Sequence, residues 1–358
     1  MFNNKKILSL LLVVLLILSV MSGCAKKDPV DTGEVDTPDT TEEETPDESE
    51  EDAPEEDTPE VKDDYKIVLL LPGPINDQGW NATAYEGLQL VEKDLGIKME
   101  YLESVQQADF EAVFTDYGEK EYDLVFAHGT QFFDAAVAVG PKYPDTFYMV
   151  INSEEGQEPN VGGVGVREWE GGYVAGALAA MYTETKQMGA IGSFPFPVIA
   201  GTLDAFEAAA QEYDPEIKVT KTYVNSWEDI QKGKETALAM AEAGADLVFC
   251  SANQVGLGSI DACKSKGIKA VGYISPQNEI APDTVISSVT YNTPGLFKSA
   301  VQQLIDGELT ADGKSLGWID DVLDMQWGEL ATDEAKEYVN EVIERLRNGE
   351  IENPYKGE

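Results

Sequence analysis

The chain has 358 residues, 42% of them hydrophobic, and a formal net charge of −42. Such an excess of acidic residues disfavours nucleic acid and anionic lipid surfaces as partners. The part of the chain after residue 64 is long enough for two lobes with hydrophobic cores, at roughly 100–200 residues per domain.

Residues 1–24 have the layout of a secretory signal peptide. Lys5 and Lys6 precede an apolar run at residues 8–20, which leads to Gly23 and Cys24. The run is shorter than the roughly 20 apolar residues that span a membrane, which disfavours an uncleaved anchor. The segment resembles the lipobox of bacterial lipoproteins. This resemblance implies that Cys24 carries lipid and attaches the protein to the cell membrane on its extracytoplasmic side.

Residues 25–64 contain repeated acidic residues, threonines and prolines and almost no large apolar side chain. A segment of this composition cannot bury enough apolar surface to offset its chain entropy. Like charges and prolines favour extended conformations. We therefore predict a disordered acidic linker that separates the membrane anchor from the folded part.

From Tyr65 onward, short apolar runs alternate with stretches of helical periodicity, which predicts parallel strands joined by helices. The pattern runs once from residue 66 to about 166 and starts again near 187, which predicts two doubly wound sheets. The predicted strands are 66–71, 98–102, 123–127, 146–151, 161–166, 187–192, 217–224, 246–250, 270–273 and 285–289. The predicted helices are 80–94, 107–117, 132–143, 171–183, 201–212, 229–243, 258–266 and 294–304.

Open parallel sheets bind ligands at the carboxyl ends of their strands, so the residues that follow each strand are candidates for a binding site. Asn76 and Asp77 either contact a ligand or cap the next helix, and Trp80 either stacks on a ligand or belongs to the core. His128 is the only histidine, and it either binds ligand or caps a helix. The candidates at the strand ends are Asn76, Asp77, Trp80, Asn81, Tyr85, His128, Gly129, Phe132, Phe196, Asn253 and Ser275.

Other kinds of site find little support in the residues. Besides Cys24, the chain has Cys250 and Cys263, whose spacing fits no metal motif. We interpret both as buried apolar residues, and a disulfide between them stays open. The stretch Gly256-Leu257-Gly258 lacks the third glycine of a dinucleotide fingerprint, so we expect no cofactor and no metal.

Several motifs resemble the basic membrane protein (BMP) family, which comprises substrate-binding lipoproteins of ABC transporters. The resemblance covers nearly all of residues 65–354. The motifs that carry it are Asn76-Asp77-Gln78-Gly79-Trp80-Asn81, Tyr85-Glu86-Gly87-Leu88, Gly176-Ala177-Leu178-Ala179-Ala180-Met181, Trp227-Glu228-Asp229-Ile230-Gln231-Lys232-Gly233-Lys234-Glu235, Ala243-Gly244-Ala245-Asp246-Leu247-Val248-Phe249 and Ala281-Pro282-Asp283-Thr284-Val285.

The resemblance implies an α/β type I periplasmic-binding-protein fold, in which two Rossmann-like lobes with parallel sheets close on a ligand like a hinged trap. Three crossovers near Arg167, Tyr291 and Gly317 would form the hinge. The N-terminal lobe would comprise residues 65–167 and about 292–316. The C-terminal lobe would comprise residues 168–291 and about 317–358.

Characterised members of the family bind purine nucleosides between aromatic rings and polar groups from both lobes. By motif, Asn76 and Asp77 would meet the polar edge of the ligand, Tyr85 or Trp80 would stack on it, and Asn253 would point into the cleft. Phe196 is a further stacking candidate. The family has an aspartate where Ile274 and Ser275 stand, and a lysine where Tyr291 stands. We therefore include Ser275 and Tyr291 among the site residues and expect an aromatic, largely uncharged ligand.

These observations predict a monomeric substrate-binding lipoprotein of an ABC importer, whose partners are a small-molecule ligand, a permease and the membrane lipid. The alternative is a lipoprotein sensor of the same fold that signals to a membrane partner. An enzyme that used Asp77 and Glu170 as acid and base is a third hypothesis. We expect no enzyme, because no residue in the chain activates a nucleophile.

Overall fold

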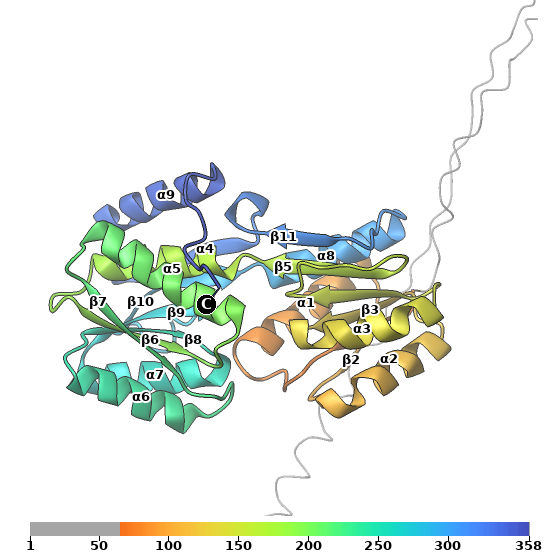
Figure 1. The fold of residues 1–358 in the computed structure, drawn as a ribbon, viewed down its shortest axis with the longest axis horizontal. Coiled ribbons are helices and arrows are strands. Elements are labelled where there is room, and N and C mark those ends of the chain that lie inside the picture. Colours follow the sequence, from red (N-terminus) through yellow and green to blue (C-terminus); the bar gives the residue numbers. More distant parts are fainter. Residues whose placement is uncertain (1–64, 358) are drawn as a thin grey trace, which may run out of the picture. The chain divides into compact units, whose positions relative to one another are not determined.

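The computed structural model describes residues 65–357. The predicted signal peptide, the lipidation site Cys24 and the acidic linker lie outside these residues. Within them the chain forms two six-stranded sheets, each covered by helices (Figure 1). We call the part built on the first sheet the N-terminal lobe and the part built on the second sheet the C-terminal lobe.

The first sheet has the strand order β11-β5-β4-β3-β1-β2, and its neighbouring strands are parallel. Its strands are β1 (Ile67–Leu70), β2 (Met99–Leu102), β3 (Leu124–His128), β4 (Phe147–Ile151), β5 (Val161–Val166) and β11 (Gly313–Leu316). The strand β1 is buried on both faces. Ile67 and Leu69 belong to one core cluster and Val68 and Leu70 to another, as the alternation of side chains along a strand requires.

The second sheet has the order β12-β10-β9-β8-β6-β7. Its strands are β6 (Gln187–Gly192), β7 (Lys218–Tyr223), β8 (Leu247–Ser251), β9 (Lys269–Ile274), β10 (Val285–Tyr291) and β12 (Leu323–Trp327). The strand β12 runs antiparallel to β10, so this sheet is mixed, whereas the sequence predicted parallel sheets. The remaining pairs are parallel.

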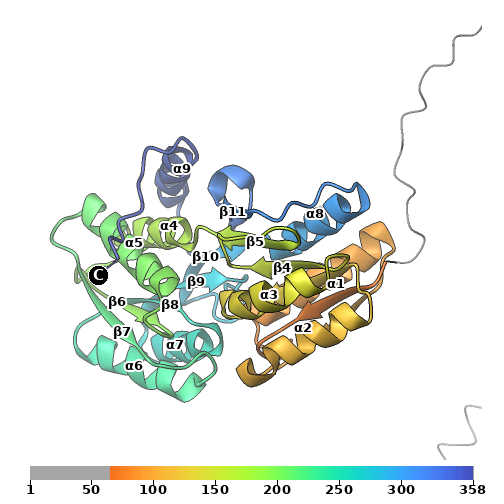
Figure 2. The same cartoon turned by 45° about the vertical axis from the view of Figure 1, so that its right-hand side comes forward.

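Helices cover both faces of each sheet (Figure 2). In the N-terminal lobe, α1 packs against α8, and α2 packs against α3. In the C-terminal lobe, α4 packs against α5 and α9, and α6 packs against α7. The helices are α1 (Trp80–Leu95), α2 (Phe110–Glu119), α3 (Phe133–Val139), α4 (Glu168–Ala180), α5 (Pro197–Tyr213), α6 (Ile230–Glu242), α7 (Asn253–Lys266), α8 (Thr293–Ile305) and α9 (Asp333–Arg347). The short 3-10 helices are η1 (Gln107–Asp109), η2 (Thr130–Phe132), η3 (Gly140–Lys142) and η4 (Trp318–Asp320).

The chain passes between the sheets after β5, after β10 and after β11. These passages lie where the sequence placed the crossovers, and together with the two α/β sheets they confirm the predicted fold class. No helix formed by residues 65–357 is both long enough and apolar enough to span a bilayer.

Three helices begin three or more residues earlier than predicted. α4 begins at Glu168 rather than at 171, α5 at Pro197 rather than at 201, and α7 at Asn253 rather than at 258. Pro197 suits a helix start, because a first-turn N–H has no intrahelical partner. The elements after residue 305 went unpredicted, and they supply one strand to each sheet and the final helix α9.

Candidate functional site

The loop between β1 and α1 is organised by Asp77. Its buried carboxylate accepts hydrogen bonds from the backbone N–H groups of Gly79, Asn81 and Ala82, at 3.0, 2.9 and 2.9 Å. The Asn81 amide donates a further bond of 2.8 Å to it. These groups are the free donors at the start of a helix, where a negative charge is also favoured. Both oxygens of Asp77 are thus engaged by the protein itself.

Trp80 and His128 form a stacked pair that joins α1 to the end of β3. Their ring centroids are 4.0 Å apart, and the planes are inclined by 16°. The indole Nε1 donates to the His128 carbonyl oxygen at 3.2 Å, and His128 Nε2 lies 2.9 Å from the Trp80 carbonyl oxygen. A carbonyl can only accept, so Nε2 carries the proton. Burial lowers the pKa of His128 to about 3, so the ring is neutral and Nδ1 is an acceptor.

The loop before α1 meets the strand ends of the C-terminal lobe. The Ser275 hydroxyl, just after β9, donates to the carbonyl oxygen of Gln78 at 2.8 Å. A methyl group added at Gly79 would lie 3.8 Å from the Cα atom of Asn253, the first residue of α7. The loop that contains Asp77 therefore meets the second sheet near Asn253 and Ser275, and His128 is joined to the start of α1 through Trp80.

Other predicted site residues lie elsewhere. Tyr85 packs edge-on against Tyr101 of the edge strand β2, with ring centroids 5.2 Å apart. The physical reason is the helix itself, since five residues at about 3.6 residues per turn separate Trp80 from Tyr85 by well over a turn. Phe132 is fully buried in the core, where it stacks on Phe110 at 4.0 Å.

The last four predicted residues have distinct surroundings. Asn76 is exposed, and Gly129 has a φ of 148°, a conformation that suits glycine alone. Phe196 is 49% exposed and stacks on Phe194 at 5.5 Å just before α5. Tyr291 is buried, and its hydroxyl lies 2.8 Å from that of Tyr273.

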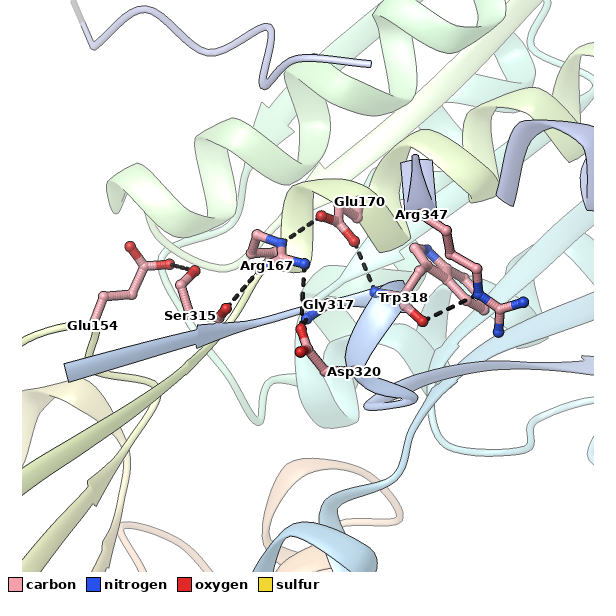
Figure 3. Close-up of polar contacts among 8 residues, drawn as sticks. All are labelled: Glu154, Arg167, Glu170, Ser315, Gly317, Trp318, Asp320 and Arg347. Atoms are coloured by element: carbon pink, nitrogen blue, oxygen red, sulfur yellow. Dashed lines mark hydrogen bonds and ion pairs between the residues drawn. The ribbon is translucent and has the colours of Figure 1, made fainter. Parts of the chain in front are cut away.

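The first and third crossovers are tied together by Arg167 (Figure 3). Its guanidinium pairs with Glu170 at 2.5 Å and donates to the Ser315 carbonyl oxygen at 2.6 Å and to Asp320 at 3.4 Å. The other Glu170 oxygen accepts from the Trp318 backbone N–H at 2.9 Å. These contacts join the chain just after β5 to the chain just after β11.

Sequence reasoning missed a buried group of side chains beside this junction. Glu168, the first residue of α4, accepts a bond of 2.8 Å from the Asn152 amide. The Tyr273 hydroxyl donates to the Glu168 backbone carbonyl at 2.8 Å, and the Tyr291 hydroxyl is a further partner of the Glu168 carboxylate. Burial raises the pKa of Glu168 to about 7, although the bonds from Asn152 and Tyr291 lower it in part.

A cavity of about 280 Å³ adjoins this group. Its lining residues are Asn152, Glu154, Gly165, Val166, Arg167, Glu168, Trp169, Pro197, Val198, Gly201, Asn353 and Tyr355. Asn152 directly follows β4, and Glu168 comes two residues after β5, so the strand-end rule would have found both had it been applied to these strands. No sequence signal points to Asn353 and Tyr355, which come from the C-terminal tail.

Residues 65–357 contain no group of three or more histidine, cysteine or acidic side chains placed to hold a metal ion. Cys250 and Cys263 are both free thiols. Burial raises the pKa of each to about 12, so neither is a reactive thiolate.

Residues 65–355 match the family described as Bmp, the PnrA-like ABC transporter substrate-binding proteins. The chain belongs to this family. Among its relatives is the transcriptional activator protein Med of Bacillus subtilis (strain 168), which is 26% identical over 68% of this chain and 76% of the relative. A purine-binding protein of Brucella abortus (strain 2308) is 26% identical, and the match covers 83% of this chain and 84% of the relative's chain.

Solved structures agree on the fold of this Bmp-family chain. A solute-binding protein of an ABC transporter system from Aeropyrum pernix K1 superimposes on this chain with a TM-score of 0.73. The superposition covers 81% of this chain and 94% of the other chain, and the two sequences are 20% identical. The family match and the fold thus agree with each other.

Proposed function

We propose that this chain is the lipid-anchored, extracytoplasmic receptor of an ABC importer and captures a nucleoside or a related aromatic heterocycle between its two lobes. The observation that carries the proposal is the contact between the loop before α1 and the strand ends of the other lobe, through Ser275 and Gln78. Ligands of α/β folds bind where such strand ends face each other.

Three buried polar atoms, on α1, at the end of β3 and just after β6, support a polar ligand. Asn81 Oδ1, His128 Nδ1 and Ser193 Oγ have no hydrogen-bond partner within the part of the chain that the structure describes. A buried polar atom without a partner costs about 1–3 kcal/mol, so a ligand or water that satisfies it is favoured. A purine edge with its sugar offers both donors and acceptors, and the indole of Trp80 offers an aromatic face.

The anchoring part of the proposal rests on the N-terminal sequence. A lipid on Cys24 would hold the receptor at the membrane beside its permease, and the linker would give it reach. The Brucella abortus relative is named for purine binding, which agrees with the ligand class. We propose that the receptor acts as a monomer.

We propose binding without turnover. Asp77 and Glu170, the two candidates for acid and base, are each engaged at both oxygens by the protein. Neither carboxylate therefore has an oxygen free of protein contacts for proton transfer to a ligand.

A sensor is the second candidate, because one relative is named a transcriptional activator. Deletion of the gene separates the two. Loss of radiolabelled nucleoside uptake supports an importer, whereas intact uptake with an altered transcriptional response to the nucleoside supports a sensor.

Isothermal titration of the purified chain with adenosine, guanosine, inosine, cytidine and uridine tests the ligand class. We expect binding of at least one nucleoside, and we expect Trp80→Ala to weaken it by about 1–3 kcal/mol through lost stacking and buried area. Trp327→Phe is the control, because Trp327 pairs with Ser287 near the start of β10, at the opposite end of the sheet. Absence of heat with all five nucleosides would remove this ligand class.

A further inference from the structure

We infer that the cavity beside the first crossover is a ligand subsite in which Glu168 accepts hydrogen bonds from hydroxyl or amino groups of the ligand, and that the C-terminal tail closes this subsite. The inference rests on the proposed function. It specifies which groups of the ligand are recognised and which residues recognise them.

The position of the cavity suits a part of the ligand that both lobes must hold. Asn152 and Glu154 reach it from the end of β4 in the N-terminal lobe. Trp169 of α4 and Pro197 at the start of α5 reach it from the C-terminal lobe. A molecule in this cavity would therefore contact both lobes next to the chain segment that joins them.

Glu168 is a buried carboxylate whose hydrogen-bond partners among residues 65–357 are neutral. Its residue is 5% exposed, yet it lines the cavity. No Lys, Arg or His nitrogen of residues 65–357 forms an ion pair with it, and the neighbouring Arg167 is engaged by Glu170 and Asp320. A buried charge without a countercharge is costly unless hydrogen-bond donors surround it.

The hydrogen bonds to this carboxylate leave some of its acceptor positions unoccupied. A carboxylate has about four acceptor positions. The Asn152 amide donates to it, whereas the Tyr291 hydroxyl donates to the Tyr273 hydroxyl, which in turn donates to the Glu168 backbone carbonyl. At least two positions thus remain for donors from a ligand. The sugar hydroxyls of a nucleoside or an amino group would fill them.

The C-terminal tail forms one wall of the cavity. Beyond α9 the chain runs back across α5 (Figure 1). The Tyr355 backbone N–H donates to the Asn353 side chain at 3.0 Å, which makes a local turn. The Tyr355 side chain packs on α5, because a methyl group added at Gly201 would lie 3.4 Å from its Cβ atom. The tail is thus placed to cover a bound ligand.

The test is titration of the full chain with adenosine, 2′,3′-dideoxyadenosine and adenine, in wild type, Glu168→Gln and Tyr355→Ala. For wild type we expect adenosine to bind more tightly than the probes that lack the hydroxyls. In Glu168→Gln the adenosine affinity should fall about tenfold to a hundredfold, as expected for hydrogen bonds to a charged group, and the dideoxyadenosine affinity should change by less than about twofold. In Tyr355→Ala all bound probes should dissociate faster.

Glu170→Gln is the control for a general disturbance of the hinge. Glu170 is a buried glutamate two residues away, bound to Arg167 and to the Trp318 N–H, and its substitution should affect all three probes to a similar degree. A Glu168→Gln variant that binds adenosine normally, or that loses all probes equally, overturns the role of Glu168. Unchanged dissociation rates in Tyr355→Ala overturn the role of the tail. A wild-type protein that binds none of the probes and no other nucleoside overturns the proposed function, and this inference with it.

Discussion

At the scale of single residues, Glu168 makes stability depend on pH. The groups that face it are the Asn152 amide, the Tyr273 and Tyr291 hydroxyls, and Arg167 and Glu170 near the start of α4. Burial raises its pKa from 4.5 to about 7. Between these values the folded protein binds a proton that the unfolded chain has lost. The free energy of unfolding contributed by this group therefore falls as the pH rises, by up to about 3 kcal/mol.

We expect Glu168→Gln to lack this part of the pH dependence. Urea unfolding of ligand-free wild type and variant at pH 5 and pH 8 measures it. The wild type should lose more stability than the variant between the two pH values. If the two proteins lose the same amount, Glu168 does not titrate in this range.

At the scale of elements, the contact between α4 and α5 depends on glycines. A Cβ atom at Gly176 would lie 2.1 Å from the Phe206 carbonyl oxygen, and one at Gly172 would lie 2.3 Å from the Thr202 carbonyl oxygen. The backbones thus approach too closely for any side chain. Apart from Trp169, every residue of α4 is buried, so the helix has no exposed face toward which it could shift.

We expect Gly176→Ala to lower the free energy of unfolding by about 1–3 kcal/mol or more, because the clash involves backbone atoms. The matched control is Gly201→Ala on α5, where the nearest atom is the Tyr355 Cβ at 3.4 Å. There the higher helix propensity of alanine should leave stability unchanged or raise it by up to about 1 kcal/mol. Chemical denaturation of both variants measures the two changes in the free energy of unfolding. Equal losses would contradict the close-approach argument.

At the scale of the whole folded part, we expect the direct contact between the lobes to contribute to the balance between closed and open forms. The bond from the Ser275 hydroxyl to the Gln78 carbonyl oxygen joins the two lobes, and separation of the lobes would break it. The residue before it, Ile274, has a φ of 71°, which is strained for a β-branched side chain. The backbone is thus held in a costly conformation next to the point of contact.

We expect Ser275→Ala to shift the equilibrium toward the open form by about 0.5–1.5 kcal/mol, or roughly two- to twelvefold in population. Single-molecule energy transfer between one dye on each lobe measures the shift. Ser265→Ala is the control, because the Ser265 hydroxyl donates to the Ala262 carbonyl oxygen, which belongs to the same lobe. Identical populations in wild type and Ser275→Ala would show that this bond does not hold the lobes together.

The sequence alone determined the two sheets and most of their strands. Strands such as β1 and β3 are buried on both faces, so they appear as unbroken apolar runs that no surface segment would have. The same reasoning placed Asp77, Trp80, His128, Asn253 and Ser275 at strand ends, because the end of an apolar run marks the edge of a parallel sheet. It stopped at residue 305. The edge strand β11 has a single large apolar residue, Leu316, and carries no clear pattern. By contrast, β12 alternates apolar and polar residues and α9 buries residues at helical spacing, so the same reasoning would have found both.

Only the tertiary structure decided which of these side chains share a site. Trp80 and Tyr85 are close in sequence, but the rotation of α1 directs Tyr85 toward β2, away from His128. Glu168 meets Tyr273 across 105 residues of chain, and Tyr355 returns to α5 from beyond α9. The local spacing of apolar residues predicts whether a residue will be buried, because the buried face of a strand or helix repeats with its period. Which distant residue it is buried against depends on how the sheets and crossovers are assembled, and that is a property of the folded chain.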